Sequence, residues 1–284
     1  MRSVSLVHVE VNCSLPDDEE FAMVARRWLE GGAAFFPELF DRLRSGAAIG
    51  AFVDQPRGAR MSQRKFSLPG WEQRLAGLDN RPLGLTLSMV EESLGSVEIT
   101  AIDEHTDQPG QVRLTINARA PELLAPDSGE RWMSFLADSV GSRSVDYGQV
   151  VLDGNINHST ALDMAVGRDF ITSIEESSKF LRGYGWITLC PKVLADRLGG
   201  GAGLEASGAF VAVRTLDSGD VLLLATATPQ EFDREALRRV WRALAPVLPP
   251  GLPEATVGYE RNEVILEDAS LASRPQPPPS SHLG

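Results

Sequence analysis

Apolar and polar positions alternate in the first segment of the chain and then recur at helical spacing in the next. Residues 4–12 alternate imperfectly but are rich in β-branched side chains, which favours a strand. Pro16 and a run of acidic residues follow, as in the first turn of a helix. We expect this helix to reach about Glu30, to end at Gly31-Gly32, and to be followed by a second helical stretch at 35–43. Its apolar positions are Phe21, Val24, Ala25, Trp28 and Leu29.

The rest of the first half predicts a sheet. Residues 45–82 are rich in Gly, Pro and Arg and predict loops around a short strand at 49–53. A further strand is expected at 83–89, and a polar turn joins 97–102 to 112–117 as a β-hairpin. Asp127 and Glu130 stand at capping-box positions before an amphipathic helix, and 146–152 predicts a closing strand.

The same order of elements recurs in the second half. Residues 184–189 predict a strand, in which Tyr184 and Trp186 are expected to be core residues, and Pro191 opens a short helix that the glycines at 199–201 end. A hairpin is expected over 209–216 and 221–226. Residues 228–231 form a capping box with proline at the first helical position, ahead of an amphipathic helix. Val257 and residues 264–266 could supply a last strand.

This recurrence predicts an α+β protein. The strand–helix–hairpin–helix–strand order suits two ferredoxin-like β-α-β-β-α-β units, whose antiparallel sheets pack as a pseudo-symmetric pair with a joint sheet. We expect an N-terminal unit at 1–152, a linker region at 153–182 and a C-terminal unit at 183–268. The Pro-rich tail at 269–284 is expected to be disordered.

The charge and composition of the chain exclude some classes of function. The chain has 284 residues with 39 acidic and 27 basic side chains, a net charge of −12 that repels nucleic acid and anionic membrane surfaces. No apolar stretch approaches the roughly 18 residues that a membrane-spanning helix needs, and no secretory signal is recognisable. Cys13 and Cys190 lie far apart in apolar settings. We therefore expect a cytoplasmic protein with two reduced, buried thiols.

The sequence offers no catalytic, cofactor or metal motif. None of the four histidines stands at the spacing of a zinc site, and phosphate-binding and GxSxG patterns are absent from the sequence. His8, Glu10 and Cys13 could form a nucleophile group. On a strand, however, residue 13 points away from residues 8 and 10, and no general base lies securely in reach. We assign no catalytic residue, no cofactor and no metal ligand.

Two polar groupings remain as candidate sites. Asp17, Asp18, Glu19 and Glu20 cluster at a helix start, where they either complement the helix dipole or form a docking patch for a basic protein partner. Asp153, His158 and Asp163 lie between the two halves. They form either a polar linker or the site of a small-molecule enzyme.

A stretch of the second half resembles a known family. Gly185-Trp186-Ile187-Thr188, Pro191, Leu194 and Leu198-Gly199-Gly200, followed by the hairpin at 211–226 and the helix end at 244–249, are similar to the bacterial type VI immunity proteins (the DUF3396 group). The resemblance covers about 182–253. It implies a cytoplasmic, non-catalytic protein that neutralises a toxin from a neighbouring cell by occluding it, with no cofactor. A basic toxin is the partner that the acidic composition suits. An enzyme with a site between the halves and a scaffold subunit remain the alternatives.

Overall fold

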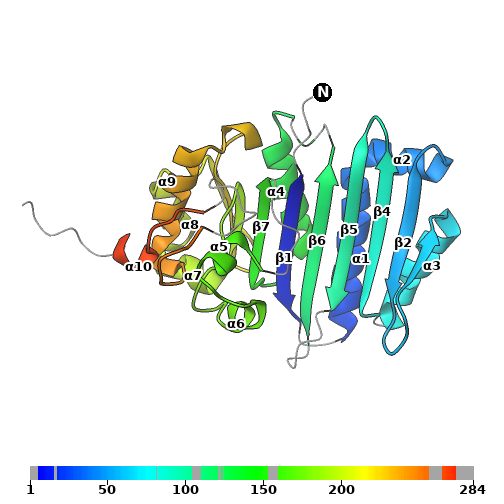
Figure 1. The fold of residues 1–284 in the computed structure, drawn as a ribbon, viewed down its shortest axis with the longest axis horizontal. Helices are drawn as coiled ribbons and strands as arrows, with labels where there is room; N and C mark the ends of the chain where they lie inside the picture. Colours follow the sequence, from blue (N-terminus) through cyan, green and yellow to red (C-terminus); the bar gives the residue numbers. More distant parts are fainter. Residues whose placement is uncertain are drawn as a thin grey trace, which may run out of the picture.

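The computed structural model describes most of the chain as one continuous sheet flanked by helices (Figure 1). The residues described are 6–15, 18–80, 82–103, 110–120, 123, 125–152, 159–255 and 264–272, with the backbone alone at 18–20. The sheet has ten strands in the order β3-β2-β4-β5-β6-β1-β7-β8-β10-β9. Every neighbouring pair runs antiparallel.

The elements have the following bounds. The strands are β1 Val7–Ser14, β2 Ile49–Gln55, β3 Ser62–Lys65, β4 Gly84–Glu91, β5 Gly95–Asp103, β6 Gln111–Arg119, β7 Tyr147–Leu152, β8 Ile187–Cys190, β9 Ala212–Thr215 and β10 Val221–Leu224. The helices are α1 Asp18–Phe35, α2 Pro37–Ser45, α3 Leu68–Gly77, α4 Ser128–Val140, α5 Ala161–Ala165, α6 Phe170–Glu175, α7 Lys192–Arg197, α8 Gly200–Ala206, α9 Arg234–Leu244 and α10 Ala269–Ala272, with short 3-10 turns at Leu78–Asn80, Pro229–Glu231 and Ala245–Val247.

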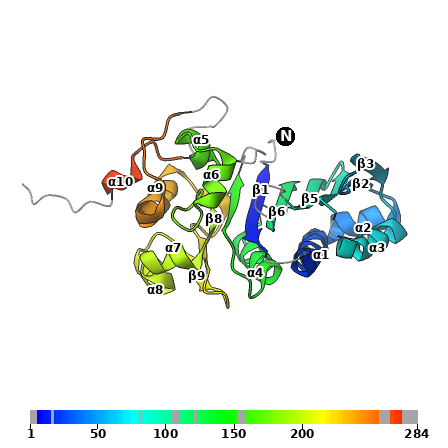
Figure 2. The same ribbon diagram turned by 90° about the horizontal axis from the view of Figure 1, so that it is seen from below.

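The first face of the sheet carries the larger core. Strand register places Val9 opposite Ile116, Ile116 opposite Ile99, and Ile99 opposite Leu87, so these apolar side chains share one face. All four are fully buried. Helices α1 to α4 cover this face, as Figure 2 shows. The periodicity of α1 explains the contact, because its apolar stripe faces the sheet.

Helices cover the second face only over the other end of the sheet. There Tyr147, Cys190 and Leu223 form a second buried cluster with Leu194 of α7 and Val240 of α9 (Figure 2). Over β2, β4, β5 and β6, by contrast, the described helices all lie on the first face. The second face accordingly carries small polar side chains there, including Thr86, Ser88, Thr100 and Thr115.

The glycines at 31 and 32 do not end α1, so that prediction is wrong. A Cβ on Gly31 would lie 3.3 Å from the Phe135 ring, and one on Gly32 would lie 3.0 Å from Ile99. The two glycines therefore allow α1 to pack closely against α4 and the sheet, and the helix continues to Phe35. Glycine occurs at positions 31 and 32 because the helix packs closely there, and not because the helix ends there.

Two segments predicted as irregular contain regular elements. Within 45–82, the strand at β2 is confirmed, but β3 and α3 were not predicted. The Ser67 hydroxyl accepts a hydrogen bond from the Gly70 amide at 3.2 Å and caps α3. In the glycine run at 199–201, Gly199 has φ +85° and ends α7 as expected. Gly200 nevertheless begins α8, which the sequence did not indicate.

Helix starts are confirmed in part. The α4 helix forms where predicted, but Asp127 makes no side-chain capping bond, so its capping box is wrong. The box at 228–231 is present and closes a 3-10 turn, whereas α9 begins later, capped by Asp233. Residues 264–266 form no strand, because the Ile265 amide donates to the Tyr184 hydroxyl at 3.0 Å instead of to a neighbouring strand. Val257 lies outside the described residues.

The mixed α+β class and the joint antiparallel sheet are confirmed, as are the β5–β6 and β9–β10 hairpins. The ferredoxin-like pseudo-symmetric pair is not confirmed. The strands β1 to β7 precede residue 153, whereas β8 to β10 are the strands described after it, so the described strands are divided unequally between the two predicted units. The expected last strand is missing from the described residues of the second unit. No helix in the described ranges is both long and apolar enough to cross a membrane.

Candidate functional site

Only some of the site residues predicted from the sequence lie in the part of the chain that the structure describes. Asp17 and the pair Asp153 and His158 lie outside the described residues. Residues 18–20 form the first turn of α1, at the backbone level only. Of the polar site predicted between the halves, only Asp163 has a described side chain, and it is fully buried in α5.

Asp163 is held by a set of donors from its own segment. Its Oδ2 accepts a hydrogen bond from the Ser173 hydroxyl at 2.6 Å, and its Oδ1 accepts one from the Arg168 guanidinium at 3.2 Å. The Arg182 Nε lies 3.5 Å from Oδ2. Burial nevertheless raises the pKa of Asp163, against the opposing effects of Arg182 and Ser173.

Arg182 connects this segment to the first strand. Its side chain is fully buried, donates to the Asn12 amide oxygen and lies 3.6 Å from the Glu10 carboxylate. Its guanidinium carbon lies 5.3 Å from the Tyr147 ring centroid. We call Glu10, Asn12, Asp163, Ser173 and Arg182 the buried charge network. It fixes α5 and α6 to the second face of β1.

Glu10 is the carboxylate at the sheet end of this network. His8 lies 3.7 Å from it and also shares a 2.7 Å hydrogen bond with Asn117. Burial alone would raise the pKa of Glu10, but His8 and Arg182 outweigh it, and the pKa lies below its ordinary value.

The buried charge network gives little support to a site for chemistry between the halves. Glu10, Asp163 and Arg182 are each at most 1% exposed, so a substrate could not reach them without opening of the surrounding core. Their charges are compensated by one another, as buried ion pairs that define a single packing arrangement usually are. We assign the buried charge network a structural role.

The nucleophile group considered from sequence is divided by the sheet. Cys13 lies in the core of the first face, opposite to His8 and Glu10. Burial raises the pKa of Cys13, and burial together with Asp220 raises the pKa of Cys190 to about 12. Both thiols are free and buried, as predicted. Among the described residues, no group of His, Cys, Asp and Glu is arranged to hold a metal ion.

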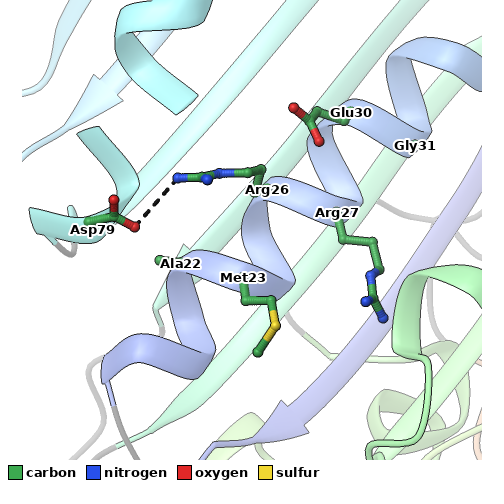
Figure 3. Close-up of a pocket in the computed structure, with 7 residues that line it drawn as sticks. All are labelled: Ala22, Met23, Arg26, Arg27, Glu30, Gly31 and Asp79. Atoms are coloured by element: carbon green, nitrogen blue, oxygen red, sulfur yellow. Dashed lines mark hydrogen bonds and ion pairs between the residues drawn. The ribbon is translucent and has the colours of Figure 1, made fainter. Parts of the chain in front are cut away.

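An accessible candidate is a hollow of about 780 Å³ on the outer side of α1 (Figure 3). Arg26 turns toward Asp79, 3.4 Å away, and donates to the Leu75 carbonyl at 3.0 Å. Met23 and Arg27 project on the opposite side of the helix, as Figure 3 shows. Met23 is 46% exposed, a high value for an apolar side chain that lines a hollow.

A second hollow of about 580 Å³ continues the first between α1 and α4. Both hollows include Arg27 and Gly31. Phe35 and Phe135 supply apolar surface in the second, and Arg131 lies 4.8 Å over the Phe35 ring. Glu130 and Asp138 of α4, and Asp127 just before it, also line this hollow. We call the two together the α1–α4 groove, lined by Met23, Arg26, Arg27, Glu30, Gly31, Phe35, Asp79, Asp127, Glu130, Arg131, Phe135 and Asp138.

A groove that is open to solvent and lined by both apolar and charged side chains is suited to binding another protein. The α1–α4 groove was not predicted from sequence. Its signal was present at Met23, Arg27 and Glu30, which recur at helical spacing on the side of α1 that the apolar stripe leaves free.

Comparison with known proteins identifies a structural likeness. No protein-family model matches the chain, and no curated protein matches its sequence. Among solved structures, the Pseudomonas aeruginosa T6SS protein PA0821 has a similar fold, with a TM-score of 0.58 and 10% sequence identity. The match covers 94% of this chain and 81% of that one. At this identity the likeness concerns the fold, over nearly the whole length of the chain.

Proposed function

We propose that this chain is a non-catalytic protein-binding module of the immunity type, which neutralises a toxin by occluding it. The observation that carries the proposal is the α1–α4 groove, in which the apolar side chains of Met23 and Phe35 stand on the same helix as the charged Arg27 and Glu30. The fold is similar to that of a Pseudomonas aeruginosa T6SS protein, which supports a role connected with type VI secretion. Such a module would act in the cytoplasm.

The distribution of ionisable groups supports binding over catalysis. Charged side chains inside the protein, such as Asp163 and Arg182, are enclosed and paired with one another. Those that line the groove, such as Arg27 and Glu30, are exposed and can meet a partner. The net charge of −12 and the acidic first turn of α1 favour a basic partner, because complementary charge accelerates the encounter of two proteins.

Co-expression tests this proposal. The chain is produced in cells together with each toxin candidate encoded by the genes adjacent to its own, and survival and co-purification are measured. We expect the native chain to protect against one of them and to form a complex with it. The substitution Met23→Glu places a charge at an exposed apolar position of the groove and should abolish both effects.

Val193→Glu is the matched control. Val193 is 50% exposed on α7, away from the groove, so the same change of chemistry there should leave protection intact. If no adjacent gene product forms a complex and none is neutralised, the proposal fails. It also fails if Met23→Glu and Val193→Glu behave alike.

A further inference from the structure

The β2–β3 hairpin is a basic element in an acidic protein. Between Asp54 and Glu72 the sequence contains four basic residues and no acidic one, although the whole chain has a net charge of −12. The four are Arg57, Arg60, Arg64 and Lys65. Arg57 is occupied by an ion pair with Asp103. The other three are exposed and form no ion pair within the described residues.

The same hairpin forms an open edge of the sheet. β3 is the outermost strand at one end and pairs, among the described strands, only with β2 (Figure 2). At the other end, β9 packs against α8, where a Cβ on Gly201 would lie 2.5 Å from Thr215. Among the described strands, β3 and β9 are therefore the two edge strands. Arg214 of β9 pairs with Glu130, whereas Arg64 and Lys65 of β3 are exposed.

Strand register defines which backbone groups point outward from β3. The Phe66 amide donates to the Gly50 carbonyl at 2.8 Å, so residues 64 and 62 continue the hydrogen-bonded pairs with β2. The amides and carbonyls of Gln63 and Lys65 consequently point away from the sheet. Such a row of free donors and acceptors can accept a further strand.

Positive charge lies on both faces of this edge. Arg64 is opposite Phe52 and shares the first face, whereas Lys65 is opposite Ala51 and shares the second. Charged edge residues protect a sheet from pairing with a second copy of itself, because like charges would meet. The same charges attract a strand of opposite sign, since cross-strand ion pairs are favourable.

We propose that the β3 edge binds an extended acidic segment of a partner protein by strand addition. The outward amides and carbonyls of Gln63 and Lys65 supply the backbone hydrogen bonds, and Arg64 and Lys65 select acidic side chains on the two faces. Met61, 65% exposed beside β3, adds apolar contact. This surface lies apart from the α1–α4 groove, and the inference does not rest on the proposed function.

The test uses the full chain and a fluorescein-labelled peptide of four consecutive glutamate residues with a valine at each end, so that glutamates face both sides of an added strand. Binding is followed by fluorescence anisotropy at low salt. Two comparison peptides separate the sources of affinity. One carries N-methyl groups on alternate amides, which removes one edge of backbone hydrogen bonding and keeps the charge. The other has lysine in place of glutamate. We expect the first peptide to bind and both comparison peptides to bind at least tenfold more weakly.

Variants of the protein assign the site. Arg64→Glu with Lys65→Glu should weaken binding at least tenfold, and so should Gln63→Pro, which removes one outward amide without removing charge. Arg239→Glu with Arg242→Glu changes the net charge equally on exposed positions of α9 and should leave binding unchanged. Far-ultraviolet circular dichroism verifies that each variant is folded.

Three outcomes would overturn the proposal: no binding of the valine–glutamate peptide, equal binding of its N-methylated form, or equal loss in the β3 and α9 variants. Met23→Glu should have no effect in this assay. A failure here is thereby distinguished from a failure of the groove.

Discussion

Arg182 and Glu10 form an ion pair at 3.6 Å inside the protein, although one follows α6 and the other belongs to the first strand. Both side chains are buried, and Arg182 also lies 3.5 Å from Asp163. The pair therefore joins the segment between the halves to the centre of the sheet. Removal of one charge leaves the others buried and uncompensated, which is the costly way to break such a network.

Arg182→Met should lower the free energy of unfolding by about 3 to 5 kcal/mol, because Glu10 and Asp163 both lose their shared cation. Urea denaturation monitored by tryptophan fluorescence measures the change. Arg239→Met removes an exposed arginine, which lies 3.7 Å from Glu235, and should have little effect. Equal stability of the native chain and Arg182→Met would show that the buried charge network contributes nothing to the fold.

The stability of the native chain relative to Glu10→Gln should depend on pH. The pKa of Glu10 lies below its ordinary value, so the ionised carboxylate stabilises the fold above the unfolded pKa, and this stabilisation is lost as pH falls through the folded pKa. The difference in unfolding free energy should be constant near neutrality and should shrink below about pH 4.5. Urea denaturation at a series of pH values measures it.

For Asp163→Asn we expect the opposite dependence of the unfolding free energy on pH. Because burial raises the pKa of Asp163, the native state binds its proton more tightly than the unfolded state does. The native chain should therefore gain stability relative to Asp163→Asn as pH falls through that raised pKa. If the two differences in unfolding free energy, one for Glu10→Gln and one for Asp163→Asn, change in the same direction with pH, the assignment of opposite pKa shifts to the two carboxylates is wrong.

Local patterns predicted those elements whose side chains meet near neighbours in the sequence. The β5–β6 hairpin and the apolar stripe of α4 are of this kind. The buried charge network was not predictable, because Arg182 and Glu10 meet only after the halves share one sheet. The interpretation of Gly31-Gly32 failed for the same reason, since the residues that require a missing Cβ, Phe135 and Ile99, come from distant elements. The α1–α4 groove likewise exists only once α4 has packed beside α1.

Gly32→Val tests whether close packing is the reason for glycine at this position. A Cβ there would lie 3.0 Å from the Ile99 side chain and 3.4 Å from the Ile116 side chain, so either these side chains or α1 must shift to accommodate valine. We expect a loss of about 1 to 3 kcal/mol in the free energy of unfolding. Gly77→Val is the control, because a Cβ at the end of α3 meets nothing within 4 Å. It should cost much less, since valine has a better helix propensity than glycine. If Gly32→Val is as well tolerated as Gly77→Val in thermal and urea unfolding, α1 does not depend on the small side chain for its contact with the sheet, and the glycine pair needs another explanation.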